Sequence, residues 1–174
     1  DLSAQSNIDN LYAIGEVAHT GVHGANRIAS NSLLECIVFA KSCAKNINKN
    51  SIGNIFPTIN AWDASRVEPS KERVVVTHLW HEVRRIMWNF VGIVRSDRRL
   101  KSAHHRIQQI HKEVNDYYQL YTITDDLIEL RNLVQTSKII VESALSRKES
   151  RGLHFNQDYP KQLDKAHNSV IMKS

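Results

Sequence analysis

The sequence has 174 residues, and at about 100–200 residues per domain it holds one domain, or one domain with part of another. Hydrophobic residues make up 41% and charged residues 24%, which is typical of a globular protein, and charges interrupt the apolar stretches before the roughly 18 residues that a membrane span needs. The net charge of +5 is spread out, and its densest basic run carries no ladder of aromatic residues, so we expect neither a membrane span nor a nucleic-acid partner.

The first part of the chain predicts a strand, a loop and a helix in turn. Residues 11–16, Leu-Tyr-Ala-Ile-Gly-Glu, predict a short buried strand that ends on an acid. Residues 20–27, Thr-Gly-Val-His-Gly-Ala-Asn-Arg, are polar and contain two glycines, which is typical of a loop. A helix is expected from Ser32 to about Lys45, because Ser32 and Glu35 have the spacing of a capping box and apolar residues follow at helical intervals.

This unit places several groups where cofactors and anions are commonly bound. Glu16 follows the strand, where α/β proteins accept hydrogen bonds from ribose hydroxyls, although many acids in this place are merely solvated. A helix that starts on small residues offers free amide N–H groups and the positive end of its dipole, and Ser32 and Leu33 would supply those donors. Arg27 is either a surface residue or a planar cation that holds a carboxylate. His23, beside the glycines, is interpreted as structural.

The cysteines and the start of the chain bear on its location. Cys36 and Cys43 lie seven residues apart on the predicted helix, too far for a disulfide, and are interpreted as small buried hydrophobic residues. The chain opens on Asp1 without the basic and apolar segments of a signal peptide. We therefore expect a reducing compartment, the cytoplasm, and a chain that begins at a cut in a longer protein.

The rest of the sequence predicts a helical bundle. Residues 48–72 contain Asn, Ser, Gly and Pro with little periodicity and predict a linker. Three apolar stripes then predict an up-down-up bundle, with a break at Asp97 and a cap at Thr124 or Asp125. The stripes comprise Val76, Leu79, Trp80, Val83, Ile86, Met87, Phe90 and Val94; Leu100, Ala103, Ile107, Ile110, Val114 and Tyr117; and Leu127, Leu130, Val134, Ile140, Val141, Ala144 and Leu145. The aromatic Trp88 is also interpreted as core.

The end of the chain predicts a helix stop and a tail. Gly152 has the character of a glycine that ends the third helix, and residues 158–160, Asp-Tyr-Pro, indicate a turn. The last dozen residues are expected to be frayed. No Cys or carboxylate completes a metal-ligand set with the helix histidines His78, His81, His104, His105 and His111, so we expect no metal site.

Several segments of the sequence resemble a known family. Residues 15–16, 23–27 (His-Gly-Ala-Asn-Arg) and 31–35 (Asn-Ser-Leu-Leu-Glu) resemble the end of the flavin-binding domain in the family of succinate dehydrogenase, fumarate reductase and L-aspartate oxidase. The start of the bundle, 86–95, and the tail segments 149–155 and 158–160 are similar to the oxidase branch in particular. Residues 26–32 read Asn-Arg-Ile-Ala-Ser-Asn-Ser, where the dehydrogenases usually read Asn-Arg-Leu-Gly-Gly-Asn-Ser, which also favours the oxidases.

The resemblance implies roles for four residues. Glu16 matches the acid that binds the ribose of FAD, and Ser32 and Leu33 match the pair whose amides approach the flavin ring. Arg27 matches the arginine that holds a carboxylate of the dicarboxylic substrate. The implied reaction oxidises L-aspartate to iminoaspartate, with FAD reoxidised by dioxygen or fumarate. It would be the first step of NAD biosynthesis, with quinolinate synthase downstream.

We therefore expect a mainly α chain, in which a three-helix bundle is preceded by a strand-loop-helix remnant of an α/β FAD-binding domain. The expected parts are the FAD-domain edge (1–47), the linker (48–72), the bundle (73–152) and an extended tail (153–174). The family's Gly-x-Gly-x-x-Gly turn and capping domain are missing, so we assign no catalytic residue here and expect the chain alone to be inactive. Two alternatives stay open: the flavoprotein of a succinate or fumarate enzyme, and a non-catalytic helical interaction module.

Overall fold

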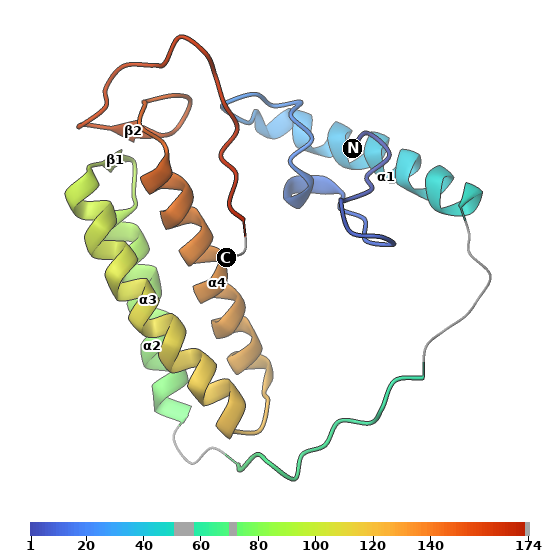
Figure 1. Cartoon of the computed structure of the whole chain (residues 1–174), viewed down its shortest axis with the longest axis vertical. Coiled ribbons are helices and arrows are strands. Elements are labelled where there is room, and N and C mark those ends of the chain that lie inside the picture. The colour runs from blue at the N-terminus through green and yellow to red at the C-terminus, as the bar shows by residue number, and fades with distance from the viewer. Residues whose placement is uncertain (51–57, 70–72, 173–174) are drawn as a thin grey trace. The chain divides into compact units, whose positions relative to one another are not determined.

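The computed structural model describes residues 1–50, 58–69 and 73–172. The chain divides into two compact units, Asp1–Asn60 and Ala61–Ser174, which are called here the N-terminal unit and the C-terminal unit (Figure 1). The predicted linker falls partly on residues 51–57 and 70–72, which lie outside the described residues. The mainly helical class is confirmed, because four α-helices make up most of the regular structure of the described part.

The N-terminal unit contains a short 3-10 helix, η1 (Gly15–Ala18), and one long helix, α1 (Ala29–Lys49). The strand predicted at 11–16 is wrong. Tyr12 makes a single antiparallel bridge with Gln5, and the chain then turns into η1. A strand is stable only beside neighbours that take up its backbone hydrogen bonds, and among the described residues only the segment around Gln5 lies beside it.

Helix α1 starts earlier than predicted. Its N-cap is Ile28, which has extended backbone and gives no side-chain cap, so Ser32 is already the fourth helical residue. The predicted capping box is therefore wrong, and the carboxylate of Glu35 is used elsewhere. The helix also continues to Lys49 instead of ending near Lys45.

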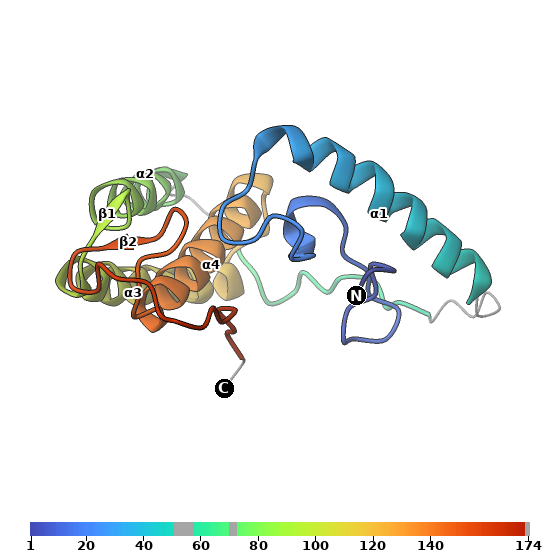
Figure 2. The ribbon, with the colours of Figure 1, turned by 90° about the horizontal axis from the view of Figure 1, so that it is seen from above.

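The C-terminal unit is a three-helix bundle closed at one end by a two-stranded parallel sheet. The helices are α2 (Arg73–Phe90), α3 (Asp97–Leu120) and α4 (Asp125–Ser146), and they lie side by side in both views (Figures 1 and 2). Strands β1 (Val94–Arg95) and β2 (Phe155–Asn156) pair with Val94 opposite Phe155. The predicted bundle is thus confirmed. No helix in the described part of the chain combines the length and apolar character that crossing a bilayer would require.

Most of the apolar stripes form the core of this bundle, but the placement of Val94 and Ile140 in it is wrong, because each is 41% exposed and Val94 lies in β1. The buried members of the core are Leu79, Val83, Ile86, Val91, Leu100, Ala103, Ile107, Ile110, Val114, Leu130, Val134, Val141 and Ala144. The assignment of Trp88 to the core is wrong, because its side chain is 85% exposed. It follows Ile86 by two residues, which turns it about 200° around the helix and away from the core.

Side-chain caps begin the last two helices. The Thr124 hydroxyl accepts a hydrogen bond from the Leu127 amide at 3.3 Å, which confirms one of the two predicted caps of α4. The Ser96 hydroxyl accepts one from the Arg99 amide at 3.3 Å, so the predicted break at Asp97 falls on the first residue of α3.

The chain beyond α4 differs from the prediction. The helix ends at Ser146, and Gly152, with φ of +59°, instead forms a tight turn in which Arg151 and His154 pair. The tail is also anchored rather than frayed through its length. The Arg147 guanidinium donates to the His167 carbonyl at 2.6 Å, and the Arg151 guanidinium donates to the Leu163 carbonyl at 2.7 Å.

Candidate functional site

The residues singled out in the sequence lie in the N-terminal unit, around η1 and the start of α1. Arg27 and Glu16 are brought together: Nη1 of Arg27 lies 2.6 Å from Oε1 of Glu16. The Arg27 side chain is 40% exposed and that of Glu16 is 79% exposed, so both are open to a ligand. The hydrogen bond and charge of Glu16 raise the pKa of Arg27 above its ordinary value, so the pair stabilises a guanidinium that is already cationic.

Glu35 is a polar residue of this region whose role the sequence pattern did not indicate. Its side chain is buried and accepts hydrogen bonds from the Thr20 hydroxyl at 2.5 Å and from Nε2 of His23 at 2.7 Å. These two bonds lower the pKa of Glu35, so it is ionised at neutral pH. Glu35 therefore ties the glycine-containing loop to α1 and fixes the segment that leads to Arg27. The available signal is an acid inside the apolar run Leu33–Val38, but its spacing from Ser32 also fits a capping residue.

Two polar atoms beside this loop lack a hydrogen-bond partner among the described residues. They are Nδ1 of His23 and the hydroxyl of Ser32, and both are buried. Nε2 of His23 is bonded to Glu35, so Nδ1 is the ring nitrogen that is left for another partner. Buried polar atoms normally have partners, so these two atoms are suited to contact with a group that the chain itself does not supply.

The start of α1 is suited to an electron-rich group. No side chain caps it, so the amides of Ala29 and Ser30 in the first turn are free of side-chain partners and lie at the positive end of the helix dipole. Ser32 and Leu33 are the fourth and fifth residues, whose amides are ordinarily bonded to carbonyls four residues earlier. The structure thus places the free amides three residues before the predicted pair, while the Leu33 side chain is exposed at the same end of the helix.

The loop has room for a ligand. Gly21 and Gly24 both have positive φ, and a Cβ added at either would meet nothing within 4 Å. The donor set fits one edge of an FAD site: a carboxylate for hydroxyl groups, free amides with a helix dipole for electron-rich ring atoms, and an unpartnered hydroxyl. Phosphates are usually held by a glycine-rich turn between a strand and a helix, and the described residues contain no strand that leads into such a turn.

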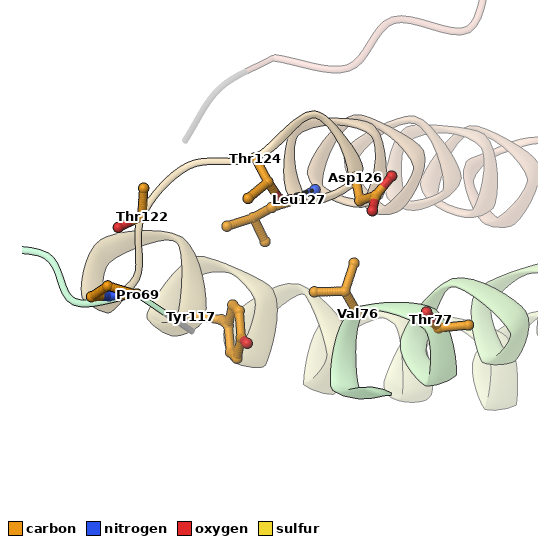
Figure 3. Close-up of a pocket in the computed structure, with 8 residues that line it drawn as sticks. All are labelled: Pro69, Val76, Thr77, Tyr117, Thr122, Thr124, Asp126 and Leu127. Carbon is orange, nitrogen blue, oxygen red and sulfur yellow. Dashed lines mark hydrogen bonds between the residues drawn. The ribbon is translucent and has the colours of Figure 1, made fainter. Parts of the chain in front are cut away.

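A cavity of about 330 Å³ lies in the C-terminal unit, where α2 and α4 begin and α3 ends (Figure 3). Figure 3 shows Val76 and Leu127 facing each other across it, with Tyr117 on one side and Asp126 at the start of α4. Its described lining residues include no cationic side chain, and Thr124 is already used as a helix cap. It therefore does not suit a dicarboxylate or a phosphate. The described residues also contain no group of three or more His, Cys, Asp or Glu side chains that could hold a metal ion.

The fold and this edge define a class of protein: the end of an FAD-binding domain followed by a helical domain. Family models agree, since residues 1–33 match the model described as "FAD binding domain" and residues 80–173 match the one described as "Fumarate reductase flavoprotein C-term". The second match covers more than half of the chain. The chain therefore belongs to the fumarate reductase flavoprotein C-terminal family.

Curated relatives are similar along nearly the whole chain. L-aspartate oxidase 1 of Ralstonia nicotianae is 52% identical over 98% of this chain, and L-aspartate oxidase of Yersinia pestis is 48% identical over 98%. A chloroplastic L-aspartate oxidase 2-b of Nicotiana tabacum is 38% identical over 91%. The chain spans only 32%, 32% and 27% of these proteins, respectively.

Solved structures show the same fold. A quinol-fumarate reductase with menaquinol molecules has a TM-score of 0.69 at 22% identity, covering 95% of this chain and 32% of its own. The Mycobacterium smegmatis Sdh1 complex in its apo form has a TM-score of 0.63 at 25% identity, covering 87% of this chain and 28% of its own.

Proposed function

We propose that the chain is the C-terminal part of an FAD-dependent L-aspartate oxidase, which converts L-aspartate to iminoaspartate. The observation that carries the proposal is the 46–52% identity to four bacterial L-aspartate oxidases over 97–99% of the chain. In this proposal residues 1–47 are the edge of the FAD-binding domain, 48–72 the linker, 73–152 the bundle domain and 153–174 its tail. The chain alone is inactive, because the catalytic base lies outside it.

Arg27 is the proposed substrate-binding residue. Its guanidinium is partly exposed, and it already holds one carboxylate oxygen, that of Glu16, at 2.6 Å. A carboxylate of L-aspartate would bind the same donors, because the planar fork of arginine matches the two oxygens of a carboxylate. Holding the substrate by its carboxylates fixes the Cα–H bond in one orientation. Such a cation therefore promotes the oxidation mainly by positioning the substrate.

Glu16, Ser32 and Leu33 are the proposed cofactor-binding residues. Glu16 would accept hydrogen bonds from ribose hydroxyls of FAD, while the start of α1 would stabilise negative charge on the flavin ring through its dipole. The hydroxyl of Ser32 is buried there without a hydrogen-bond partner, and the side chain of Leu33 is exposed. FAD, when bound, supplies the two-electron oxidation of the amino acid.

The wider setting follows from the same proposal. We propose dioxygen or fumarate as the final electron acceptor. Iminoaspartate would be consumed by quinolinate synthase in NAD biosynthesis, in the cytoplasm.

The test uses the full-length protein that contains this chain, purified with FAD. L-aspartate or succinate is added without oxygen, and the yellow flavin absorbance is followed. Bleaching by aspartate alone is the expected result. Bleaching by succinate alone would move the protein to the succinate and fumarate enzymes, and bleaching by neither would overturn the proposal.

The role of Arg27 has its own test. We expect Arg27→Leu to raise the KM for L-aspartate by at least about tenfold, because a charge-assisted hydrogen bond contributes about 1.5–3 kcal/mol. Arg98→Leu, on the exposed face of α3, is the matched control and should leave the KM unchanged. Equal kinetics for the two variants would remove Arg27 from the substrate site.

A further inference from the structure

The proposed function assigns FAD and the substrate to two residues that form an ion pair with each other. Glu16, proposed for the FAD ribose, and Arg27, proposed for the substrate carboxylate, form one ion pair at 2.6 Å. A carboxylate of this chain therefore occupies the donor that a substrate carboxylate would use. Glu16 and the substrate compete for Arg27 as long as Glu16 has no other partner.

Glu16 is the more exposed member of this pair. Its side chain is 79% exposed, and Arg27 is the one described residue with which it forms an ion pair or hydrogen bond. The second acid near Arg27 is Glu35, whose charge also raises the pKa of Arg27. Glu35 is buried and held by Thr20 and His23, so it remains in place and does not compete. It supplies a fixed negative charge near Arg27 when Glu16 moves away.

We propose that Glu16 makes substrate binding depend on cofactor binding: without FAD its carboxylate occupies Arg27, and ribose hydroxyls that bind Glu16 release Arg27 for a dicarboxylate. This inference rests on the proposed function, because it takes both residue roles from it. It adds an order of binding, with FAD before the dicarboxylate, and a residue that sets this order. Coupling of this kind is reciprocal, so a bound dicarboxylate also tightens FAD binding by the same factor.

The coupling is several-fold in size. The pair is exposed, and exposed ion pairs are weak, so removal of the competing carboxylate should improve dicarboxylate affinity by about two- to fivefold. The effect is specific to Glu16. Asp9, another exposed acid of the N-terminal unit, forms no ion pair with a described residue and serves as the matched control.

The experiment measures malonate binding to the full-length protein by calorimetry, with and without FAD. Malonate is a dicarboxylate without an amine and with a single CH2 group, so it can be oxidised neither to an imine nor to an alkene, and it reports binding alone. Without FAD, Glu16→Gln should bind malonate about two- to fivefold more tightly than the wild type, and Asp9→Asn should match the wild type. FAD should tighten malonate binding less in Glu16→Gln than in the wild type, and the two tightening factors should differ by the same roughly two- to fivefold ratio. Glu16→Asp, which keeps the charge on a shorter side chain, should lie between the two and provides a second variant.

The outcomes separate this inference from the function on which it rests. Equal malonate affinity of the FAD-free wild type and both Glu16 variants would overturn the coupling, while the oxidase proposal would stand if the FAD-loaded protein still binds malonate through Arg27. The proposed substrate site, and the coupling with it, would be overturned if the FAD-loaded wild type failed to bind malonate and Arg27→Leu left the KM for L-aspartate unchanged.

Discussion

The two units of the chain bury apolar side chains to very different extents. In the C-terminal unit, thirteen buried hydrophobic residues form one continuous cluster between three helices. In the described part of the N-terminal unit, only Ala4 and Cys43 are hydrophobic residues buried to that degree. Helix α1 leaves Leu33, Leu34, Ile37 and Val38 exposed on adjoining turns. The C-terminal unit thus has the core of an independent domain, whereas α1 in the N-terminal unit is joined to the residues before it by side-chain hydrogen bonds, such as those of Glu35 with Thr20 and His23 and that of Ser42 with Leu2.

Among the described residues, each unit nevertheless buries one glutamate, and the two differ in the groups that hydrogen-bond to it. Glu35 in the N-terminal unit accepts hydrogen bonds from a hydroxyl and a histidine. Glu149 in the C-terminal unit is paired with Arg147 at 2.6 Å and Arg151 at 2.9 Å, and it also accepts the Leu163 amide. The first arrangement fixes a loop beside the proposed site. The second fastens the tail to the bundle.

The largest expected effect is in the bundle core. Leu100 is completely buried in α3, so Leu100→Ala should lower the free energy of unfolding of the C-terminal unit by about 2–5 kcal/mol. Urea titration followed by circular dichroism measures it. Leu120→Ala, at the exposed end of the same helix, is the matched control and should cost less than about 0.5 kcal/mol. Equal losses would show that the bundle lacks the core described here.

A second effect concerns the buried ion pairs of the tail. The Leu163 amide, followed by Arg151 and Arg147, lowers the pKa of Glu149 below its ordinary value of 4.5. A carboxylate whose pKa is lowered in the folded state adds stability above the unfolded pKa, and this is lost as the pH falls through the folded value. Glu149→Gln should therefore lower the urea midpoint at pH 7 and weaken the loss of stability on acidification below about pH 4.5.

The control for Glu149 is Glu113→Gln, at an exposed position on α3. It should leave both the midpoint at pH 7 and the acid dependence unchanged. An equal loss at pH 7 and at pH 3 for Glu149→Gln would contradict an ionised Glu149, because a protonated carboxyl would make the same contribution at both values.

The smallest effect is expected on α1. Ile37 is 59% exposed, so Ile37→Ser should change the stability of the 174-residue chain by less than about 0.5 kcal/mol. Cys43→Ser, at a buried position of the same helix, should cost more. Thermal unfolding of both variants makes the comparison. A large loss for Ile37→Ser would mean that this face of α1 is covered in the chain.

The bundle could be predicted from the sequence because its signals are local and periodic. A stripe such as Leu100, Ala103 and Ile107 marks a buried helix face whatever the helix packs against. The cap at Thr124 is equally local, since it depends on an amide three residues away. The prediction for Trp88 failed because it gave aromatic character more weight than the angle of that residue around the helix.

The site was less predictable because its structure depends on partners distant in sequence. The strand at 11–16 needs neighbouring strands, which no local pattern supplies. Ser32 and Glu35 fit a capping box by spacing, yet Glu35 bonds to Thr20, fifteen residues away, and the helix starts before Ser32. Gly152 was also misassigned from the sequence. A glycine favours a backbone with positive φ, which Gly152 has, but this does not tell whether a helix ends there.

The polar end of the bundle also has a consequence for the order in which the chain is completed during synthesis. Asp97 begins α3, but its partners Lys148, Asn156 and Tyr159 follow much later, Tyr159 by 62 residues. At 5–20 residues per second, a ribosome takes roughly 3–12 s to cover that distance. Helices α3 and α4 can pair within this interval, whereas β1 waits for β2. This end of the bundle is therefore the last part to form its contacts. A nascent chain halted before residue 148 has the three helices but lacks the partners of Asp97.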